Sequence, residues 1–575
     1  MKYLSLILLL NLVATPLLAQ YNYVATTPNS TTPSSFNTFV GSSAGNSTMS
    51  GGQNTFIGAS AGRNNTTGNY GTFIGYATGS ANNTGSANTF VGYLAGFDNK
   101  SGSSNVFLGF NTGSNNVSGN NNTFLGYLVG NNLTTGYSNT WVGHRAGYNN
   151  LSGHNSIMIG DSAGYNSTAS DNIFIGSKAA SQSTYATLNT IIGQQAGYSN
   201  YGGKENVLVG YQAGYTTYYG SANTIVGSAA GYKNQASSNT FVGYSSGYSN
   251  TSGENNSFNG NQTGYSNTTG SLNTFTGSIA GISNTTGSNN TFLGGQAGYS
   301  NNQGAYNTFV GSSTGFGTTT GSNNTFMGAS AGGNNTIGSN NTFIGNQAGS
   351  NVTTGNNNII IGPKSGTAVT DGSDNVLLGY QSQAEDGLRN AIAIGANSRV
   401  AISNALILGS GVNVGIGTSA PAVRLHVRSE QINESGVRFE QLTSQSPVAS
   451  GTDQFLAVNE KGDVIKARYQ LRISNASEWS DKVFEPGYSL IPLTKVAAYI
   501  NQHRHLPGVP SADQVVKEGI DLPRLNATLL EKIEELTLYS IQLEKANQQQ
   551  AQELQIIKQK QAQLEHMLQS LMNRK

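Results

Sequence analysis

The sequence predicts an all-β parallel β-solenoid, followed by a small α+β module and a C-terminal coiled coil. Three observations lead to this fold class. A motif of the form Asn-Thr-Phe-Val-Gly returns about every 17 residues over most of the 575-residue chain. Glycine is abundant, with 75 residues, and cysteine is absent, which excludes a disulfide framework and thiol catalysis. Only 10% of the residues are charged, and these residues concentrate in the last third.

The charges of the chain nearly cancel. Its 28 Lys and Arg residues against 27 Asp and Glu residues leave a formal net charge of +1. A protein that binds nucleic acid by electrostatic attraction needs a strongly basic surface. We therefore expect no nucleic-acid partner.

The first 19 residues have the features of a secretory signal peptide. Lys2 precedes an apolar run over residues 3–18, and the small Ala19 stands before Gln20. The run contains Pro16 and is short for a membrane-spanning helix, although an N-terminal membrane anchor is the alternative. We expect removal of residues 1–19, a linker over residues 20–36 and an exported chain with no transmembrane anchor of its own.

The repeat occupies residues 37–409 in 23 units. The glycines that close the motif recur at steps of 17 residues, except for shorter steps that end at Gly176, Gly243, Gly395 and Gly409. Each unit is expected to hold a three-residue strand ending in Gly, a second short strand such as residues 59–61, and turns of Asn, Thr and Gly. A unit this short buries its apolar face only by stacking on its neighbours, as in a solenoid. Asn and Gly suit the corners because they accept positive φ at low cost.

The strand of each unit carries apolar residues in succession, as in Thr55-Phe56-Ile57. Side chains alternate between the faces of a strand, so apolar groups point to both sides. One face fills the interior of the coil, and the other needs a cover, for which an identical chain is the economical source. The alternative is a flattened coil whose wide interior is filled by the Phe column.

The last coils resemble a known family. Residues 390–400, Asn-Ala-Ile-Ala-Ile-Gly-Ala-Asn-Ser-Arg-Val, and the 14-residue step to Gly409 are similar to the head repeats of trimeric autotransporter adhesins, the YadA-like β-roll. The 17-residue units keep the strand, Gly and small-residue pattern but have longer turns. The resemblance implies a left-handed β-roll, a homotrimer and adhesion at a bacterial surface. Residues 571–575, Leu-Met-Asn-Arg-Lys, are expected to end a polar helix, so we do not expect that family's membrane anchor here.

The chemistry of the chain changes after the repeats. Residues 37–409 hold 18 charged residues, whereas the shorter segment 410–575 holds 36. We expect a neck over residues 410–470 that contains a short strand and a β-hairpin, whose turn is Asn459-Glu460-Lys461-Gly462.

A small α+β assembly module is expected over residues 471–528. Thr494 is placed to cap a helix over residues 495–502. Ser511 and Gln514 have the spacing of a capping box, and Gly519 is suited to end the helix that they begin.

Residues 529–571 predict a coiled coil. Alternating steps of four and three residues select thirteen positions, nine of them apolar. The apolar seam consists of Leu529, Ile533, Leu536, Leu543, Leu554, Ile557, Leu564, Leu568 and Leu571. Its polar members weaken it and set register or chain number; they are Ser540, Asn547, Gln550 and Gln561. The alternative is a single amphipathic helix that lies on a domain.

Three segments, residues 479–484, 505–511 and 530–536, resemble the C-terminal region of tail-fibre-like secreted bacterial proteins. This resemblance implies a trimerisation and assembly module. Some tail-fibre relatives carry a self-cleaving chaperone with a Ser-Lys dyad. Ser480 and Lys482 stand near a comparable place, but the surrounding pattern differs, so we do not expect cleavage.

The sequence indicates no catalytic, metal or cofactor site. Of six histidines, only His503 and His505 are close in the chain, and this pair has no neighbouring carboxylate or cysteine at a metal-site spacing. The glycine-rich turns lack the Gly-Lys-Ser/Thr ending of a phosphate loop. We therefore expect neither an enzyme nor a cofactor.

One position of the repeat, directly after Ala-Gly or a variant of it, is often tyrosine. These residues are Tyr148, Tyr165, Tyr198, Tyr215, Tyr232, Tyr248, Tyr265 and Tyr299. Stacked coils would align them into a ladder beside Asn and Thr side chains, a surface suited to glycan or protein contacts. A ladder that serves only packing or solubility fits the pattern equally well.

Together these patterns predict an exported, trimeric, fibrous adhesin-like protein on a bacterial surface, either associated with the outer membrane or extracellular. Its attachment to glycan or protein ligands would rest on many weak sites that act together. The alternative is a passive fibre or surface-layer component that binds only itself. A third function is ice binding through Thr columns such as Thr55, Thr72 and Thr89, although the adjoining Phe residues disfavour a flat Thr face.

Overall fold

The computed structural model describes residues 36–432, 436–437, 440, 454–461, 463–468 and 479–573. The expected signal peptide and residues 20–35 of the expected linker lie outside these residues. The described chain divides after Val437 into two compact units, and each is presented by itself.

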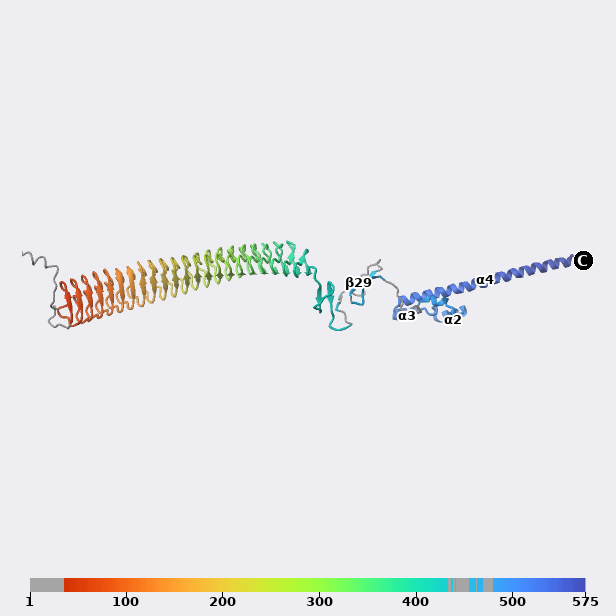
Figure 1. Ribbon diagram of the computed structural model, residues 1–575, viewed down its shortest axis with the longest axis horizontal. Helices are drawn as coiled ribbons and strands as arrows, with labels where there is room; N and C mark the ends of the chain where they lie inside the picture. The colour runs from red at the N-terminus through yellow and green to blue at the C-terminus, as the bar shows by residue number, and fades with distance from the viewer. Residues whose placement is uncertain are drawn as a thin grey trace, which may run out of the picture. The chain divides into compact units, whose positions relative to one another are not determined.

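The first unit is a parallel β-solenoid, as the sequence predicts. Twenty-three strands form a single sheet, and successive strands pair in parallel and in register, with Phe39 beside Phe56 and Val40 beside Ile57. Figure 1 shows these strands as successive coils, coloured from red to green. The strands of this sheet are β1 (Thr38–Val40), β2 (Thr55–Ile57), β3 (Thr72–Ile74), β4 (Thr89–Val91), β5 (Val106–Leu108), β6 (Thr123–Tyr127), β7 (Thr140–His144), β8 (Ile157–Ile159), β9 (Ile173–Ile175), β10 (Thr190–Ile192), β11 (Val207–Val209), β12 (Thr224–Val226), β13 (Thr240–Val242), β14 (Ser257–Asn259), β15 (Thr274–Thr276), β16 (Thr291–Leu293), β17 (Thr308–Val310), β18 (Thr325–Met327), β19 (Thr342–Ile344), β20 (Ile359–Ile361), β21 (Val376–Leu378), β23 (Ala391–Ile394) and β25 (Ala405–Leu408).

The expectation of a second short strand in every unit is wrong for the 17-residue coils. Residues 59–61 form a turn instead, because Ser60 has φ +63° and Gly62 has φ +59°, both in the left-handed region. Equivalent residues repeat this conformation in successive coils, and a left-handed residue cannot continue an extended strand. A second strand occurs only as β22 (Gln383–Ala384) and β24 (Arg399–Val400), which pair in parallel within the coils that resemble adhesin head repeats.

The middle residue of each strand fills the interior of the solenoid. Phe56, Phe90 and most of their equivalents are fully buried, and their rings stack from coil to coil with centroids 4.5 to 5.3 Å apart. At Gly62 a Cβ would lie 2.5 Å from the ring of Phe56, so glycine fits best there, although Ala180 occupies the equivalent position of its own coil at φ +49°. Gly58, at φ +134°, closes the strand where a Cβ would lie 2.2 Å from the carbonyl oxygen of Gly75.

In the three-residue strands of this sheet, the first and third residues point outward. Ile57 is 37% exposed and Leu108 is 42% exposed, while the Phe between the outward pair is buried. The prediction that apolar groups lie on both faces is therefore confirmed. The Phe column does fill the interior, as the alternative proposed. The outward aliphatic residues nevertheless have no cover within the described chain.

Two columns of buried asparagines complete the interior. The inner asparagine column precedes the strands: the Asn256 side chain accepts the backbone N–H of Asn273 at 3.0 Å and donates to Gly270 O at 2.8 Å. The corner asparagine column lies three residues before the corner glycine: Asn267 donates to Gly270 O at 2.9 Å and to Oδ1 of Asn250 at 2.7 Å. The carbonyl of Gly270 thus has two donors, one from each column.

The neck contains strand β26 (Val414–Ile416), which pairs in parallel with β27 (Leu425–Val427). In the second unit, β28 (Gln454–Val458) and β29 (Val464–Arg468) pair antiparallel. The short strand and the β-hairpin predicted from the sequence are confirmed.

The second unit also contains the 3-10 helix η2 (Ser480–Phe484) and helices α2 (Leu493–His503), α3 (Ala512–Glu518) and α4 (Leu522–Met572). Ser511 and Gln514 form the predicted capping box, and α3 ends at Gly519. The prediction that Thr494 caps α2 is wrong: Pro492 is the N-cap residue, and Thr494 already lies in the first turn.

Candidate functional site

The structure brings the predicted tyrosines together in three runs. Tyr148 stacks on Tyr165 with ring centroids 5.2 Å apart, and Tyr299 stacks on Phe316 at 4.7 Å. In the longest run, centroid distances are 4.9 to 5.1 Å and interplanar angles are 3 to 10°. This five-ring column consists of Tyr198, Tyr215, Tyr232, Tyr248 and Tyr265. The runs are interrupted where the equivalent residues are Ser181 and Ile282.

Stacking determines what the five-ring column offers to a ligand. Each inner ring is covered on its faces by its neighbours, so only ring edges and hydroxyls face solvent. None of the five hydroxyls has a hydrogen-bond partner within the described chain, and none is among its buried unpaired atoms. Burial, followed by the neighbouring Tyr215 and Tyr248, raises the pKa of the Tyr232 hydroxyl. The column therefore presents a row of neutral, unpaired hydroxyls, one per coil.

Two cations lie beside these tyrosine runs. The guanidinium carbon of Arg145 is 5.9 Å from the ring centroid of Tyr148, and Lys233 Nζ is 5.8 Å from that of Tyr248. Both distances are within cation–π range. Each of these two runs thus combines aromatic edges, hydroxyls and one positive charge.

A second aromatic column was not predicted from the sequence. It follows the glycine that closes the strand and stacks with centroids 5.1 to 5.3 Å apart. Its members are Tyr76, Tyr93, Phe110, Tyr127 and His144. At its end, His144 Nδ1 lies 2.7 Å from Asp161 Oδ1. The recurrence of an aromatic residue directly after Gly75, Gly92, Gly109 and Gly126 was the available signal.

The outward aliphatic residues of the sheet form an apolar strip along the solenoid. Exposed members include Ile57, Ile74, Leu108, Leu125, Ile159, Leu293, Met327, Ile361, Ile394 and Leu408. In β3 to β7 the strip runs only two residues away from the second aromatic column. The strip is interrupted at β14 and β15, whose third residues are Asn259 and Thr276. An exposed apolar surface of this extent is nevertheless typical of an interaction site.

The predicted seam of α4 is exposed throughout the single chain. Its exposure ranges from 42% at Leu529 to 71% at Leu571. The side chains of α4 that are buried, Ala527, Glu534 and Glu535, lie elsewhere on the helix. The long helix is thus confirmed, and its apolar seam is available for a partner.

Ser480 and Lys482 do not form a dyad. The Ser480 hydroxyl donates to Glu534 Oε1 at 3.2 Å, whereas Lys482 Nζ pairs with Glu531 Oε2 at 3.0 Å. Two different carboxylates of α4 hold the two residues, so the lysine does not activate the serine.

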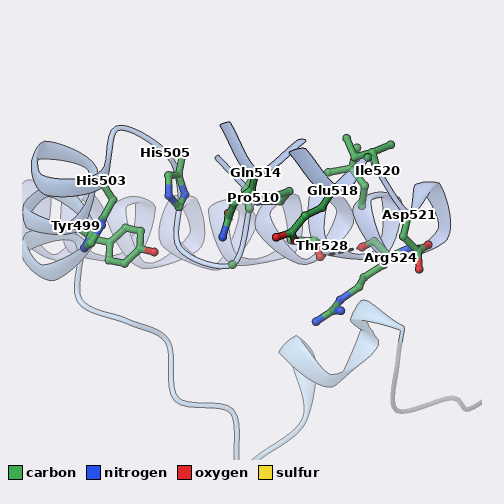
Figure 2. Close-up of a pocket in the computed structure, with 14 residues that line it drawn as sticks. Tyr499, His503, His505, Pro510, Gln514, Glu518, Ile520, Asp521, Arg524 and Thr528 are labelled. Carbon is green, nitrogen blue, oxygen red and sulfur yellow. Dashed lines mark hydrogen bonds between the residues drawn. The ribbon is translucent and has the colours of Figure 1, made fainter. Parts of the chain in front are cut away.

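A cavity of about 670 Å³ lies in the C-terminal unit. Figure 2 shows Tyr499 and His503 towards one end and Asp521 with Arg524 towards the other. The imidazoles of His503 and His505 are 6.1 Å apart, centroid to centroid. No group of three or more His, Asp or Glu side chains in the described part of the chain is arranged to hold a metal ion.

In the described ranges, no helix combines the length and apolar character needed to cross a bilayer. Comparisons of the chain with protein-family models, with curated proteins and with solved structures found no match.

Proposed function

We propose that this protein is an exported, fibrous adhesin that binds glycan or protein ligands on a surface through a repeated set of weak contacts. The observation that carries this proposal is the five-ring column, Tyr198 to Tyr265, with its unpaired hydroxyls repeated once per coil. The sequence features of a signal peptide support export to a bacterial surface.

Multivalency follows from the repeat. The sheet and the asparagine columns hold each coil in register with the next, so the hydroxyls form a fixed array. A ligand with periodic donors and acceptors engages several of them at once. The effective concentration of the later contacts is then high, and avidity exceeds the affinity of any one contact.

A homotrimer is part of this proposal. A long helix with an exposed apolar seam is marginal in water by itself, and partner helices supply the missing contacts. The apolar strip of the solenoid supports self-association independently. The number three and the left-handed β-roll come from the resemblance of residues 390–400 to adhesin heads, and the coiled coil comes from the spacing of the apolar residues over 529–571.

Glycan and surface-protein arrays probed with the full chain test the adhesin function. Serine in place of the tyrosines of the five-ring column should abolish array binding, since it removes every ring edge and phenol of that column. Tyr70→Ser with Tyr306→Ser is the matched control, because both tyrosines are 63% exposed and neither stacks on another ring of the described chain. No binding by the wild type, or equal losses in both variants, would contradict the proposal.

A passive fibre that binds only itself is the second candidate, favoured by the apolar strip along the sheet. Electron microscopy separates the two functions. Filaments or ordered layers of the purified chain, together with silence on arrays, would support the passive fibre.

Ice binding is a third candidate. The sequence argument that Phe disturbs the Thr face does not hold, since Phe56 points inward while Thr55 and Ile57 point outward. The face nevertheless alternates Thr with larger aliphatic residues, and several of its strands lack Thr altogether, such as β11 (Val207–Val209) and β20 (Ile359–Ile361). Absence of thermal hysteresis in the wild type would eliminate this candidate.

A further inference from the structure

A polar groove of about 510 Å³ lies near the C-terminal end of the solenoid. Its lining includes Gln347, Lys364, Thr367, Gln381, Gln383 and Arg399. Gln347, Lys364 and Gln381 occupy the same left-handed position in three successive coils, with φ between +51° and +56°. The volume is within the range of small-molecule sites, roughly 300–1,000 Å³.

The groove lies where the tyrosine position no longer carries rings. Thr367 follows Gly366 as Tyr299 follows Gly298, so it occupies the position that holds stacked rings earlier in the solenoid. After Phe316 this position becomes Gly333, Ser350 and Thr367. Small residues replace rings here, and the long side chains of the left-handed position become one wall of an open groove.

The groove holds one free positive charge. Lys364 is exposed and has no ion-pair partner anywhere in the described chain. Arg399 is already neutralised, because its Nε donates to Glu385 Oε1 at 2.8 Å. Lys364 is therefore the cation that an anionic ligand in the groove would meet.

The rest of the lining offers amides. Gln383 Nε2 donates to Lys364 O at 2.8 Å and to Thr367 Oγ1 at 3.1 Å, which fixes one wall. The side-chain amides of Gln347, Gln381 and Asn397 have no hydrogen-bond partner among the described residues. Free amides both donate and accept, as sugar hydroxyls do.

We propose that this groove binds a carboxylated saccharide, with its carboxylate at Lys364 and its hydroxyls on the free amides. A neutral sugar would leave the cation unused, and a simple carboxylate would leave the amides unused. The groove is separate from the five-ring column, so a test of saccharide binding in the groove does not depend on whether the five-ring column binds a ligand.

Isothermal titration of the full chain tests the proposal with two acidic probes, trigalacturonic acid and 3′-sialyllactose, and their neutral counterparts, methyl-esterified trigalacturonate and lactose. We expect at least one acidic probe to bind at least tenfold more tightly than its counterpart, and less tightly as salt rises. No binding of either acidic probe at 5 mM, or equal binding of acidic and neutral probes, would overturn the proposal.

Two variants locate the site. Lys364→Gln should weaken binding at least tenfold without disturbing the fold, since Gln347 and Gln381 hold the same backbone conformation in the adjacent coils. Thr367→Tyr keeps the charge but extends the ring position into the groove, and it should block binding as well. Lys178→Gln is the control, because Lys178 has the same left-handed conformation, with φ +56°, far along the solenoid from the groove.

The outcomes are distinguishable from those of the adhesin test. Serine substitution of the five-ring column should leave binding of the acidic probes unchanged. If Lys178→Gln weakened binding as much as Lys364→Gln, or if both groove variants bound normally, the groove would not be the site.

Discussion

The solenoid and the C-terminal unit are stabilised in opposite ways. Inside the solenoid, neutral amides bond backbone groups of the next coil, and most of the buried asparagines are paired in this way within one chain. In the C-terminal unit, charged side chains meet instead: Glu531 pairs with both Lys482 and Lys532, while the apolar seam of α4 stays exposed. The interior of the repeat is therefore closed largely within one chain, whereas the apolar seam of α4 has no cover within the described chain.

The largest effect on assembly is expected from changes in the exposed apolar seam of α4. Ile557→Lys combined with Leu564→Lys places two charges in the seam of α4, and assembly should be lost, because buried unpaired charges are strongly unfavourable. Mass measurement in solution should change from a trimer to a monomer, while the β signal in circular dichroism persists.

The control places the same charges on the other side of α4. Gln559→Lys with His566→Lys adds two lysines halfway between seam positions, so the trimer should persist. A wild-type monomer, or an assembly that survives lysines in the seam, would show that α4 does not hold the chains together.

A smaller effect is expected inside the solenoid. Asn256→Ala removes the acceptor of the buried Asn273 N–H, and an orphaned buried backbone group costs about 1–3 kcal/mol, to which a small cavity adds. Thermal or urea unfolding of the full chain should show a lower midpoint for the β transition.

The corner asparagine column provides the contrast. Asn267→Val should cost less, because Gly270 O keeps its bond from Asn256. Among the side chains, Oδ1 of Asn250 loses its donor, and Asn284 Nδ2 loses one acceptor but still donates to Gly287 O. The chain already shows this arrangement, since Asn335 Oδ1 is buried and unpaired where Val352 follows it. Equal losses for the two variants would remove the distinction between the columns.

The period and the residue types were sufficient to predict the solenoid. A 17-residue repeat of strand, glycine and turn residues has few other ways to bury Phe56 and its equivalents. The second strand was predicted wrongly because Ala59-Ser60-Ala61 has no local signal for the left-handed φ of Ser60. That conformation comes from stacking against adjacent coils, which a single unit does not encode.

The candidate sites were predicted only in part. Tyrosines at one repeat position predicted a ladder. This inference is simple, because equivalent residues of successive coils become neighbours when the coils stack. The groove at Lys364 was not predicted from the sequence. It depends on which long side chains flank Thr367, which occupies the repeat position that is tyrosine in earlier coils. Arg399 is neutralised by Glu385 of the preceding coil, whereas Lys364 has no ion-pair partner in the described chain. No local pattern in the sequence indicates this difference.

The smallest expected effect concerns pH and the charged cluster of the C-terminal unit. Burial alone would raise the pKa of Glu531, but hydrogen bonds from Lys482 and Lys532 outweigh it and hold the pKa below its usual value. A carboxyl with a lowered folded-state pKa stabilises the fold above its unfolded pKa of about 4.3, and this contribution is lost as pH falls through the folded value. Since Lys482 is half exposed, we expect at most about 1 kcal/mol.

Circular dichroism at 222 nm measures this contribution in the full chain, because every helix of the described residues lies between Ser480 and Met572. At pH 7, Glu531→Gln should melt slightly below the wild type, and at pH 2 the two should coincide, since both side chains are then neutral. Glu553→Gln removes a carboxylate that has no ion pair within the described chain, so it should show no such pH-dependent difference. If Glu531→Gln still melted below the wild type by the same amount at pH 2, packing and not charge would hold η2 against α4. The charged residues of the C-terminal unit would then distinguish it from the solenoid in composition but not in how it is stabilised.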